Sequence, residues 1–293
     1  MNRKSVITGL LLLLLGVASQ GIAAGTWEFA LSLPGKGAEH SLGEALALAM
    51  DESRQRYYVV DSSHGQLVSF DQQGQFLNAL NPGNALKKPV AMALASAGKF
   101  WVIERSNNQL VYVDLDRQQV RAFSLFAPDG LPIFPEKVKV DRKNRLYLLD
   151  RSRGTVVRLD DNLKVKQTFL GEKGFRGFTD FLLTEEGLWA LDALRRELTL
   201  FDDNGKRLRK VELVDKLSFP VAFETDSAGQ FYLLDRHAAK ILVFNRSGEF
   251  SYEFLIKGKR QGQLWYPAGL KFDWAGRLCV VNEGNGRIDI YSR

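Results

Sequence analysis

The sequence contains one cysteine and three histidines among its 293 residues. A single thiol, Cys279, excludes a disulfide within the chain and a zinc site built from several cysteines. His40, His64 and His237 all fall in connections that we expect at one end of the molecule. They are therefore candidates for an imidazole metal site, but each occupies a different position relative to the local pattern. We predict no bound metal and no cofactor.

The common catalytic motifs are also missing. The sequence has no phosphate-cradling loop, no haem-attachment motif and no Gly-x-Ser-x-Gly nucleophile turn. Ser62 and Ser63 precede His64, but neighbours in sequence are no evidence for a Ser–His pair, whose members meet through the fold. Cys279 lies inside an apolar segment, which indicates a buried small hydrophobic residue rather than a reactive thiol.

One long apolar run lies at the N-terminus. Arg3 and Lys4 precede an apolar segment from Val6 to Val17, and small residues follow up to Ala24. This layout is typical of a secretory signal peptide over residues 1–24, whose core is too short to span a membrane comfortably. An uncleaved anchor over residues 5–24 is the alternative. We expect a periplasmic or secreted protein with no stable membrane span after processing.

A repeat of 42 to 47 residues organises the remaining sequence. Six apolar runs each end in an acidic or amide residue, here called the marker residue. An aromatic residue stands three positions before five of the six markers, and an aliphatic residue stands six positions after every one. The markers are Asp61, Glu104, Asp150, Asp192, Asp235 and Asn282.

Each repeat has the pattern of four short strands separated by Gly, Asn and Asp turns, and this pattern predicts an all-β protein. A four-stranded unit of this length cannot bury both of its faces alone, which is typical of a propeller blade. An Asp at a strand end can accept backbone N–H groups of the adjacent turn. We therefore interpret the markers as structural rather than catalytic.

The repeat resembles the NHL family in the apolar run ending in Asp, in the aliphatic residue six positions later and in the Phe70-Asp71 and Phe201-Asp202 pairs. The Gly-His and Trp-Asp dipeptides typical of WD40 blades are absent. Glu104 and Asn282 depart from the family pattern, as does the missing proline at the start of the fourth repeat. The resemblance implies a six-bladed β-propeller. The family includes metal-dependent lyases such as the peptidylglycine amidating lyase.

The sixth repeat lacks its fourth strand, because only two residues follow Tyr291. The pattern that opens this strand elsewhere, at Gly74 and Gly248, recurs in Gly25-Thr26-Trp27. We therefore predict one domain, residues 25–293, a six-bladed propeller of four-stranded antiparallel blades. Its ring is closed by an N-terminal strand, so that residues 25–33 complete blade 6 and remove an open edge.

Three charged residues replace small or apolar residues in the strand nearest the expected axis. The column contains Ala49, Ala93, Lys139, Leu183, Glu224 and Lys271. Buried ions are costly unless they are well paired. We expect these charges to face a wet axial channel, the alternative being that Glu224 neutralises a neighbouring lysine.

The functional prediction rests on charge. In an antiparallel meander, the turns between second and third strands lie at the same end as the blade-to-blade connections. Cations outnumber carboxylates in these segments, whereas the rest of the mature chain sums to a negative charge. The predicted binding residues are Arg105, Arg151, Arg153, Arg195, Arg196, Arg236, Lys240, Arg287, Lys259, Arg260 and Trp265.

These residues predict an exported, non-enzymatic binding or scaffold propeller that presents a basic loop face to an acidic protein or an anionic glycan. Nucleic acid is not an expected partner outside the cytoplasm. A metal-dependent lyase or hydrolase that uses the axial channel is the first alternative, because propellers host both binding and catalysis. A structural subunit of an envelope complex is the second. The sequence does not predict the oligomeric state.

Overall fold

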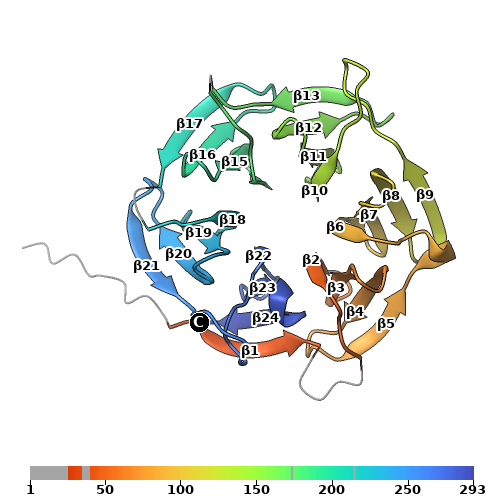
Figure 1. Ribbon diagram of the computed structural model, residues 1–293, viewed down its shortest axis with the longest axis horizontal. Helices are drawn as coiled ribbons and strands as arrows, with labels where there is room; N and C mark the ends of the chain where they lie inside the picture. Colours follow the sequence, from red (N-terminus) through yellow and green to blue (C-terminus); the bar gives the residue numbers. More distant parts are fainter. Residues whose placement is uncertain (1–25, 35–39, 173, 214–215) are drawn as a thin grey trace, which may run out of the picture.

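The computed structural model describes residues 26–34, 40–172, 174–213 and 216–293, and the proposed signal peptide lies outside these ranges. Six four-stranded antiparallel sheets are arranged in a ring, as Figure 1 shows. The predicted six-bladed propeller is confirmed. Within the described ranges, no helix has the length and apolar character needed to cross a membrane.

The strands of each blade follow one another from the axis outwards. Blade 1 contains β2 (Ala45–Asp51), β3 (Arg56–Asp61), β4 (Gln66–Phe70) and β5 (Phe76–Leu80). Blade 2 contains β6 (Pro89–Ser96), β7 (Lys99–Glu104), β8 (Gln109–Asp114) and β9 (Gln119–Phe123). Blade 3 contains β10 (Pro135–Val140), β11 (Leu146–Asp150), β12 (Thr155–Leu159) and β13 (Val165–Phe169).

The second half of the ring repeats this order. Blade 4 contains β14 (Asp180–Leu183), β15 (Leu188–Asp192), β16 (Glu197–Phe201) and β17 (Arg207–Glu212). Blade 5 contains β18 (Pro220–Thr225), β19 (Phe231–Asp235), β20 (Lys240–Phe244) and β21 (Phe250–Phe254). Blade 6 contains β22 (Gly269–Phe272), β23 (Leu278–Asn282), β24 (Arg287–Ser292) and β1 (Glu28–Leu33), with the 3-10 turns η1 (Pro82–Asn84) and η2 (Glu283–Asn285) in connections.

The hydrophobic core lies between neighbouring blades. The second strands, such as β11 and β19, are buried along their whole length because both of their faces are covered. The outermost strand β17 is exposed at five of its six positions. Cys279 on β23 is fully buried, as its apolar surroundings predicted, and burial raises the pKa of its thiol.

The N-terminal strand closes the ring as predicted. In blade 6, β1 pairs antiparallel with β24, so that Phe29 lies opposite Tyr291 and Leu33 lies opposite Ile288. Figure 1 shows β1 as the outermost strand beside β24. The first and last strands of the described chain are thus joined in one sheet, and β24 is paired on both of its edges, with β23 and with β1.

The marker residues stabilise one end of the propeller, which we call the loop face. It is formed by the turns between second and third strands and by the blade-to-blade connections. Asp61 accepts the backbone N–H groups of Gly43 and Glu44, 3.1 and 3.3 Å away, just before β2. Glu104 accepts those of Lys87 and Lys88 just before β6. The structural interpretation of the markers is confirmed.

The opposite end contains the other turns, and they use a shorter version of the same device. Asp202 accepts the backbone N–H groups of Asn204 and Lys206, 2.9 and 2.8 Å away. Asp141 does the same for Lys143 and Arg145. Lys143 and Lys206 therefore lie at the end opposite to the loop face.

Candidate functional site

The loop face contains every residue predicted to bind a partner, but six of the ten predicted cations are paired with carboxylates of the same chain. Arg236 makes two bonds to Glu283, at 2.7 and 3.1 Å, and donates to the carbonyls of Tyr266 and Pro267. Arg153 bonds Asp129 and Asp150, each at 2.9 Å. These two arginines tie the blade connections to the turns.

Three further cations on this face are also neutralised. Lys240 pairs with Glu253 at 2.8 Å, and Arg287 pairs with Asp289 at 2.8 Å. Arg105 lies 3.8 Å from a carboxylate oxygen of Glu136 on β10. The charge count along the connections omitted these strand carboxylates and the marker acids at the same end. The loop face is thus less basic as a whole than the connections alone suggest.

Aromatic contact is present beside the basic residues of blade 6. The ammonium groups of Lys257 and Lys259 lie 5.2 and 5.3 Å from the centroid of the Trp265 ring. Arg260 is exposed in the same connection, and its carbonyl accepts a bond from Arg287. Trp265 is half-buried, and its backbone N–H donates to the marker Asn282.

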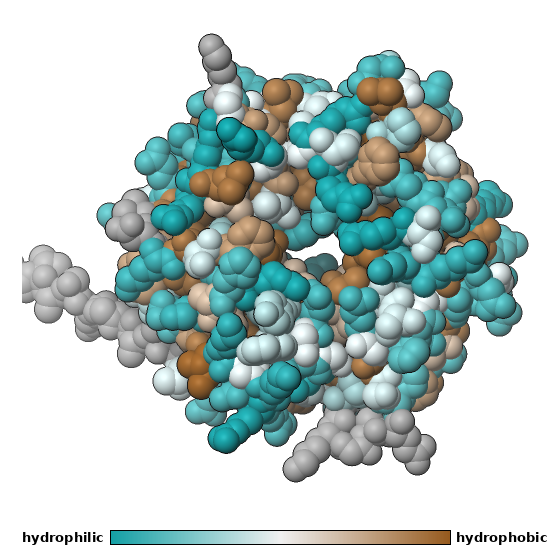
Figure 2. Space-filling model, viewed as in Figure 1, coloured by the Kyte–Doolittle hydropathy of each residue, from teal (hydrophilic) through white to brown (hydrophobic). Residues whose placement is uncertain are grey.

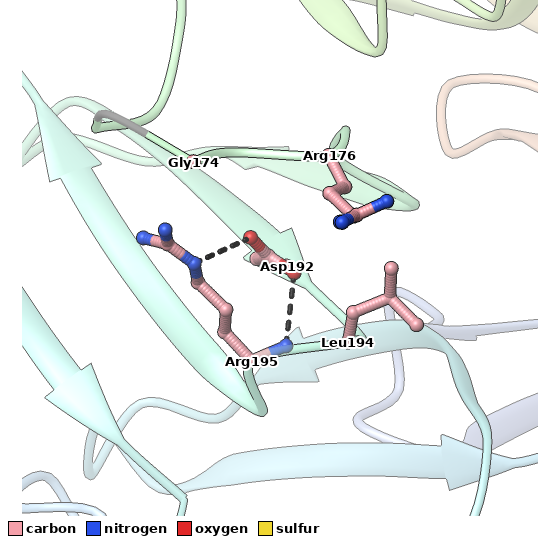
Figure 3. Close-up of a pocket in the computed structure, with 5 residues that line it drawn as sticks. All are labelled: Gly174, Arg176, Asp192, Leu194 and Arg195. Atoms are coloured by element: carbon pink, nitrogen blue, oxygen red, sulfur yellow. Dashed lines mark hydrogen bonds and ion pairs between the residues drawn. The ribbon is translucent and has the colours of Figure 1, made fainter.

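One group of arginines on the loop face lies between blades 3 and 4. Here a pocket of about 200 Å³ is lined by Gly174, Arg176, Asp192, Leu194 and Arg195 (Figure 3). Arg195 folds back over Asp192, with 3.8 Å between its Nε and a carboxylate oxygen. The side chains of Arg176 and Leu194 extend on the other side of Asp192, and Leu194 is 69% exposed.

Two more exposed arginines lie in the turns of blades 3 and 4 at this end of the propeller. Arg196 follows Arg195 in the turn, and Arg151 lies in the neighbouring turn of blade 3. That turn packs tightly on the connection to blade 4, because the N–H of Phe178 donates to the carbonyl of Gly154 at 2.8 Å. Arg151, Arg176, Arg195 and Arg196 form what we call the arginine cluster. Arg176 was counted among the cations of the blade-to-blade connections but was not singled out as a binding residue, because its position in a long connection gave no sign that it faces the blade 4 turn.

The three histidines are not brought together. His64 bonds the marker Asp61 at 2.7 Å; burial alone would raise the pKa of the Asp61 carboxyl, but His64 and the other donors around it hold that pKa below its ordinary value. His40 stacks on Phe76 and His237 stacks on Phe219. In the described part of the chain, no three His, Cys, Asp or Glu side chains are grouped so as to hold a metal ion.

The axial channel contains charged residues from four adjacent blades, and Figure 2 shows the ring to be hollow at its axis. Lys137 and Lys139 on β10 approach Asp180 on β14, at 3.1 and 3.6 Å. Glu224 on β18 and Lys271 on β22 interact electrostatically with each other and with Lys139. Both alternatives considered for this column are therefore partly correct, since the charges face the channel and also neutralise one another.

Burial in the channel perturbs these groups. Burial raises the pKa of the Glu224 carboxyl, and the attraction of Lys139 and Lys271 offsets this only in part. Burial lowers the pKa of the Lys271 ammonium. Burial would also raise the pKa of Asp180, but Lys137, Lys139 and the backbone N–H of Phe223 together hold it below its ordinary value.

A larger hollow of about 820 Å³ lies between blades 2 and 3 and includes Trp101, Phe123 and Phe126 in its lining. Its charged groups have structural partners. Asp160 accepts two backbone N–H groups of its own turn, and Arg145 is held between Asp141 and Asp203. We assign no chemistry to this hollow.

Comparison with known proteins agrees with the architecture. No protein-family model and no curated protein matches the sequence, so the NHL family is not confirmed. A streptogramin B lyase structure is similar with a TM-score of 0.68 at 10% identity, over 91% of this chain and 97% of that one. A gluconolactonase from Xanthomonas campestris is similar with a TM-score of 0.67 at 14% identity, over 86% of each chain.

A third solved structure, an inactive variant of virginiamycin B lyase from Staphylococcus aureus with quinupristin, has a TM-score of 0.64 at 16% identity. The likeness spans 89% of this chain and 83% of that one. These neighbours are six-bladed propellers. At such identities the likeness shows the fold and does not transfer an activity.

Proposed function

We propose that this chain is an exported, non-enzymatic binding propeller whose loop face binds an acidic protein. The observation that carries the proposal is the arginine cluster beside an exposed leucine. Guanidinium groups bind carboxylates in a planar, two-bonded geometry. Leu194, 69% exposed beside them, adds the apolar contact that protein partners use at the centre of an interface. An anionic glycan would use the arginines but gain less from the leucine.

The proposed binding surface is smaller than the basic loop face predicted from the sequence. Arg153, Arg236, Lys240 and Arg287 are held by carboxylates of the same chain, and binding a partner through them would first break these pairs. The exposed Arg151, Arg176 and Arg196 have no ion pair within the described part of the chain, so binding through them requires no such exchange. Lys259, Arg260 and Trp265 in the connection to blade 6 form a second, smaller part of the proposed surface.

The test is a binding measurement on the mature protein with two probes, a labelled peptide of alternating Glu and Leu and a heparin oligosaccharide. The double variant R176E/R196E reverses two charges of the cluster, and K143E/K206E reverses two at the opposite end. We expect R176E/R196E to weaken peptide binding at least tenfold and K143E/K206E to leave it unchanged. Raising the salt from 0.05 to 0.3 M should weaken peptide binding. The distance over which charges attract each other is about 10 Å at 0.1 M salt and shortens as the salt concentration rises.

Two results would overturn the proposal. Equal effects of both charge reversals would make the basic residues a general solubility feature. Tighter, arginine-dependent binding of heparin than of the peptide would assign the surface to an anionic glycan. The L194S variant separates these cases further. Loss of the leucine side chain should weaken binding of the peptide and leave binding of heparin unchanged.

Export is the second part of the proposal and depends on residues 1–24. We expect the protein in the periplasm or the medium, with a mature N-terminus at or just before Ala24 that keeps β1 intact. Fractionation followed by mass spectrometry measures both. A mature chain beginning beyond Leu31 would contradict it, because that chain would lack most of the closing strand.

The alternative function, a metal-dependent lyase or hydrolase, has its own measurement. Metal analysis of the purified protein, with and without chelator, tests whether a metal is bound in stoichiometric amount. Stoichiometric zinc or calcium together with chelator-sensitive activity would replace the binding proposal.

A further inference from the structure

Trp101 is packed differently from its counterparts in other blades. In blades 1, 4 and 5, the aromatic residue three positions before the marker meets a ring of the next blade. These pairs, with their centroid distances, are Tyr58 with Phe100 at 4.6 Å, Trp189 with Phe231 at 5.2 Å and Tyr232 with Phe272 at 5.1 Å. The ring contacts of Trp101 in the described chain are Tyr112 and Phe123 of its own blade. Leu146 of blade 3 stands where blades 2 and 5 have Phe100 and Phe231, so no ring of the next blade covers the indole.

Trp101 is also the exposed member of its column. It is partly exposed, whereas the other five residues three positions before a marker are buried. These five are Tyr58, Tyr147, Trp189, Tyr232 and Cys279. Trp101 lines the hollow of about 820 Å³ between blades 2 and 3. Small-molecule sites commonly have volumes of about 300–1,000 Å³. A position that belongs to the core in the other blades therefore borders a cavity of ligand size here.

The two sides of this hollow differ in chemistry. Blade 2 and the connection after it contribute the rings of Trp101, Phe123 and Phe126, and Phe126 is 55% exposed. Two turns of blade 3 contribute exposed polar residues, namely Asn144, Asp161, Asn162 and Lys164. In the described part of the chain, none of these four side chains has a hydrogen-bond or ion-pair partner. Their donors and acceptors are therefore available to a ligand that packs on the rings.

The connection that carries Phe126 is held in place by the protein itself. It folds back as a hairpin, in which the backbone N–H of Ala127 donates to the carbonyl of Leu131 at 2.9 Å. Arg153 of blade 3 bonds both carboxylate oxygens of Asp129 in the same hairpin, at 3.0 and 2.9 Å. Because the hairpin is already ordered against blade 3, a ligand need not order it on binding.

The charges that line the hollow cancel. Arg145 is held between two carboxylates, and Asp160 accepts backbone N–H groups of its own turn. The remaining charged residues of the lining are Asp161 and Lys164, one of each sign. An uncharged ligand therefore fits this lining better than an anion or a cation does.

We propose that the hollow between blades 2 and 3 binds a neutral oligosaccharide, without catalysing a reaction on it. The face of a sugar ring carries C–H groups, whose partial positive charge suits the negative face of the Trp101 and Phe126 rings. The hydroxyl groups at the ring edge both donate and accept, so they match the side chains of Asn144, Asp161 and Asn162. An apolar peptide would use the rings but leave these polar groups unpaired.

The experiment measures the binding of cellotetraose and of chitotetraose to the mature protein by calorimetry, at 0.05 and 0.3 M salt. The ring substituents of both sugars are equatorial, so their ring faces carry C–H groups alone. We expect saturable binding of at least one of them that salt does not weaken, because the ligand has no charge to be screened. A phenylalanine tripeptide blocked at both ends is the comparison and should bind more weakly.

A matched pair of variants tests the aromatic side. Phe126 and Leu131 are 55% and 59% exposed on the same hairpin, and Phe126 lines the hollow whereas Leu131 does not. F126A should weaken sugar binding about tenfold, because a stacking partner is lost. L131A should leave the affinity unchanged.

A second pair tests the polar side. Asn162 and Asn204 have the same position in equivalent turns of blades 3 and 4, and each donates its backbone N–H to the first Asp of its turn at 2.9 Å. N162A should weaken sugar binding several-fold, and N204A should leave it unchanged. Since all four changed side chains are exposed, each variant should keep the thermal transition of the parent protein.

Three results would overturn the proposal. They are no saturable binding of either sugar, equal affinities of F126A and L131A for the sugar, and tighter binding of the tripeptide than of both sugars. The site is separate from the arginine cluster, so R176E/R196E should bind the sugar as the parent protein does. Failure of one proposal is thereby distinguished from failure of the other.

Discussion

The indole ring of Trp27 stacks on the ring of Phe254, with their centroids 5.4 Å apart and their planes at 10°. Trp27 also forms a T-shaped pair with Tyr232, with 6.0 Å between the ring centroids, and the guanidinium of Arg293 lies over the Trp27 ring, 5.2 Å from its centroid. The residue just before β1 therefore contacts blade 5, while β1 itself completes blade 6. Closure of the ring uses two interfaces rather than one.

The first prediction concerns this closure. W27A should lower the free energy of unfolding by about 2 kcal/mol, because a half-buried aromatic side chain loses its stacking partners. E28A, which changes an exposed residue of the same strand, should change it by less than about 0.5 kcal/mol. Urea unfolding followed by fluorescence measures both. Equal midpoints for the two variants would show that Trp27 is not part of the closure.

The second prediction concerns the marker residues. Asp235 accepts the backbone N–H groups of Ser218, Phe219 and Ala238. D235A leaves these part-buried donors without their acceptor and should cost about 1–3 kcal/mol. D235N should cost less, because Asn282 has the same position in blade 6. Thermal unfolding of both variants, with D161A in an exposed turn as the control, tests the order.

The third prediction separates structural from binding arginines on the loop face. R236A breaks the link from blade 5 to Glu283 and to the carbonyls of blade 6, and should destabilise the protein by about 1–2 kcal/mol. R176A should leave the free energy of unfolding within about 0.5 kcal/mol of that of the parent protein. It should also weaken binding of the acidic peptide. If R236A left the stability unchanged while R176A lowered it, the assignment would be wrong.

The fourth prediction concerns pH and stability. Because the pKa of Glu224 is raised above its unfolded value of about 4.3, the folded state binds more protons between these two pKa values. The destabilisation by the ionised carboxyl is thus present above the folded pKa and disappears as the pH falls to the unfolded pKa. E224Q should stabilise the protein at pH 8 and have little effect at pH 4, as measured by urea unfolding across this range. A constant effect across that range would contradict the predicted titration.

The sequence by itself determined the architecture. The regular spacing of the markers and the apolar columns in register with them define six equivalent units, because each blade must bury both faces of its inner strands against its neighbours. The missing fourth strand after Tyr291 and its spare copy near Trp27 determined how the ring closes. The marker role could be predicted for the same reason, since an acid at a strand end has local backbone donors to satisfy.

Only the tertiary structure decided which charges are available. Arg236 and Glu283 lie in different blades, as do Lys137 and Asp180, so their pairing follows from the ring and not from any local pattern. A count along the connections treats each cation as exposed, whereas the folded chain brings strand carboxylates to half of them. Arg176 is placed beside Leu194 by the close approach of Gly154 and Gly177, where an added Cβ on Gly154 would lie 2.3 Å from Gly177. Contacts between blades are long-range and side-chain specific, and a repeating sequence pattern holds no information about them.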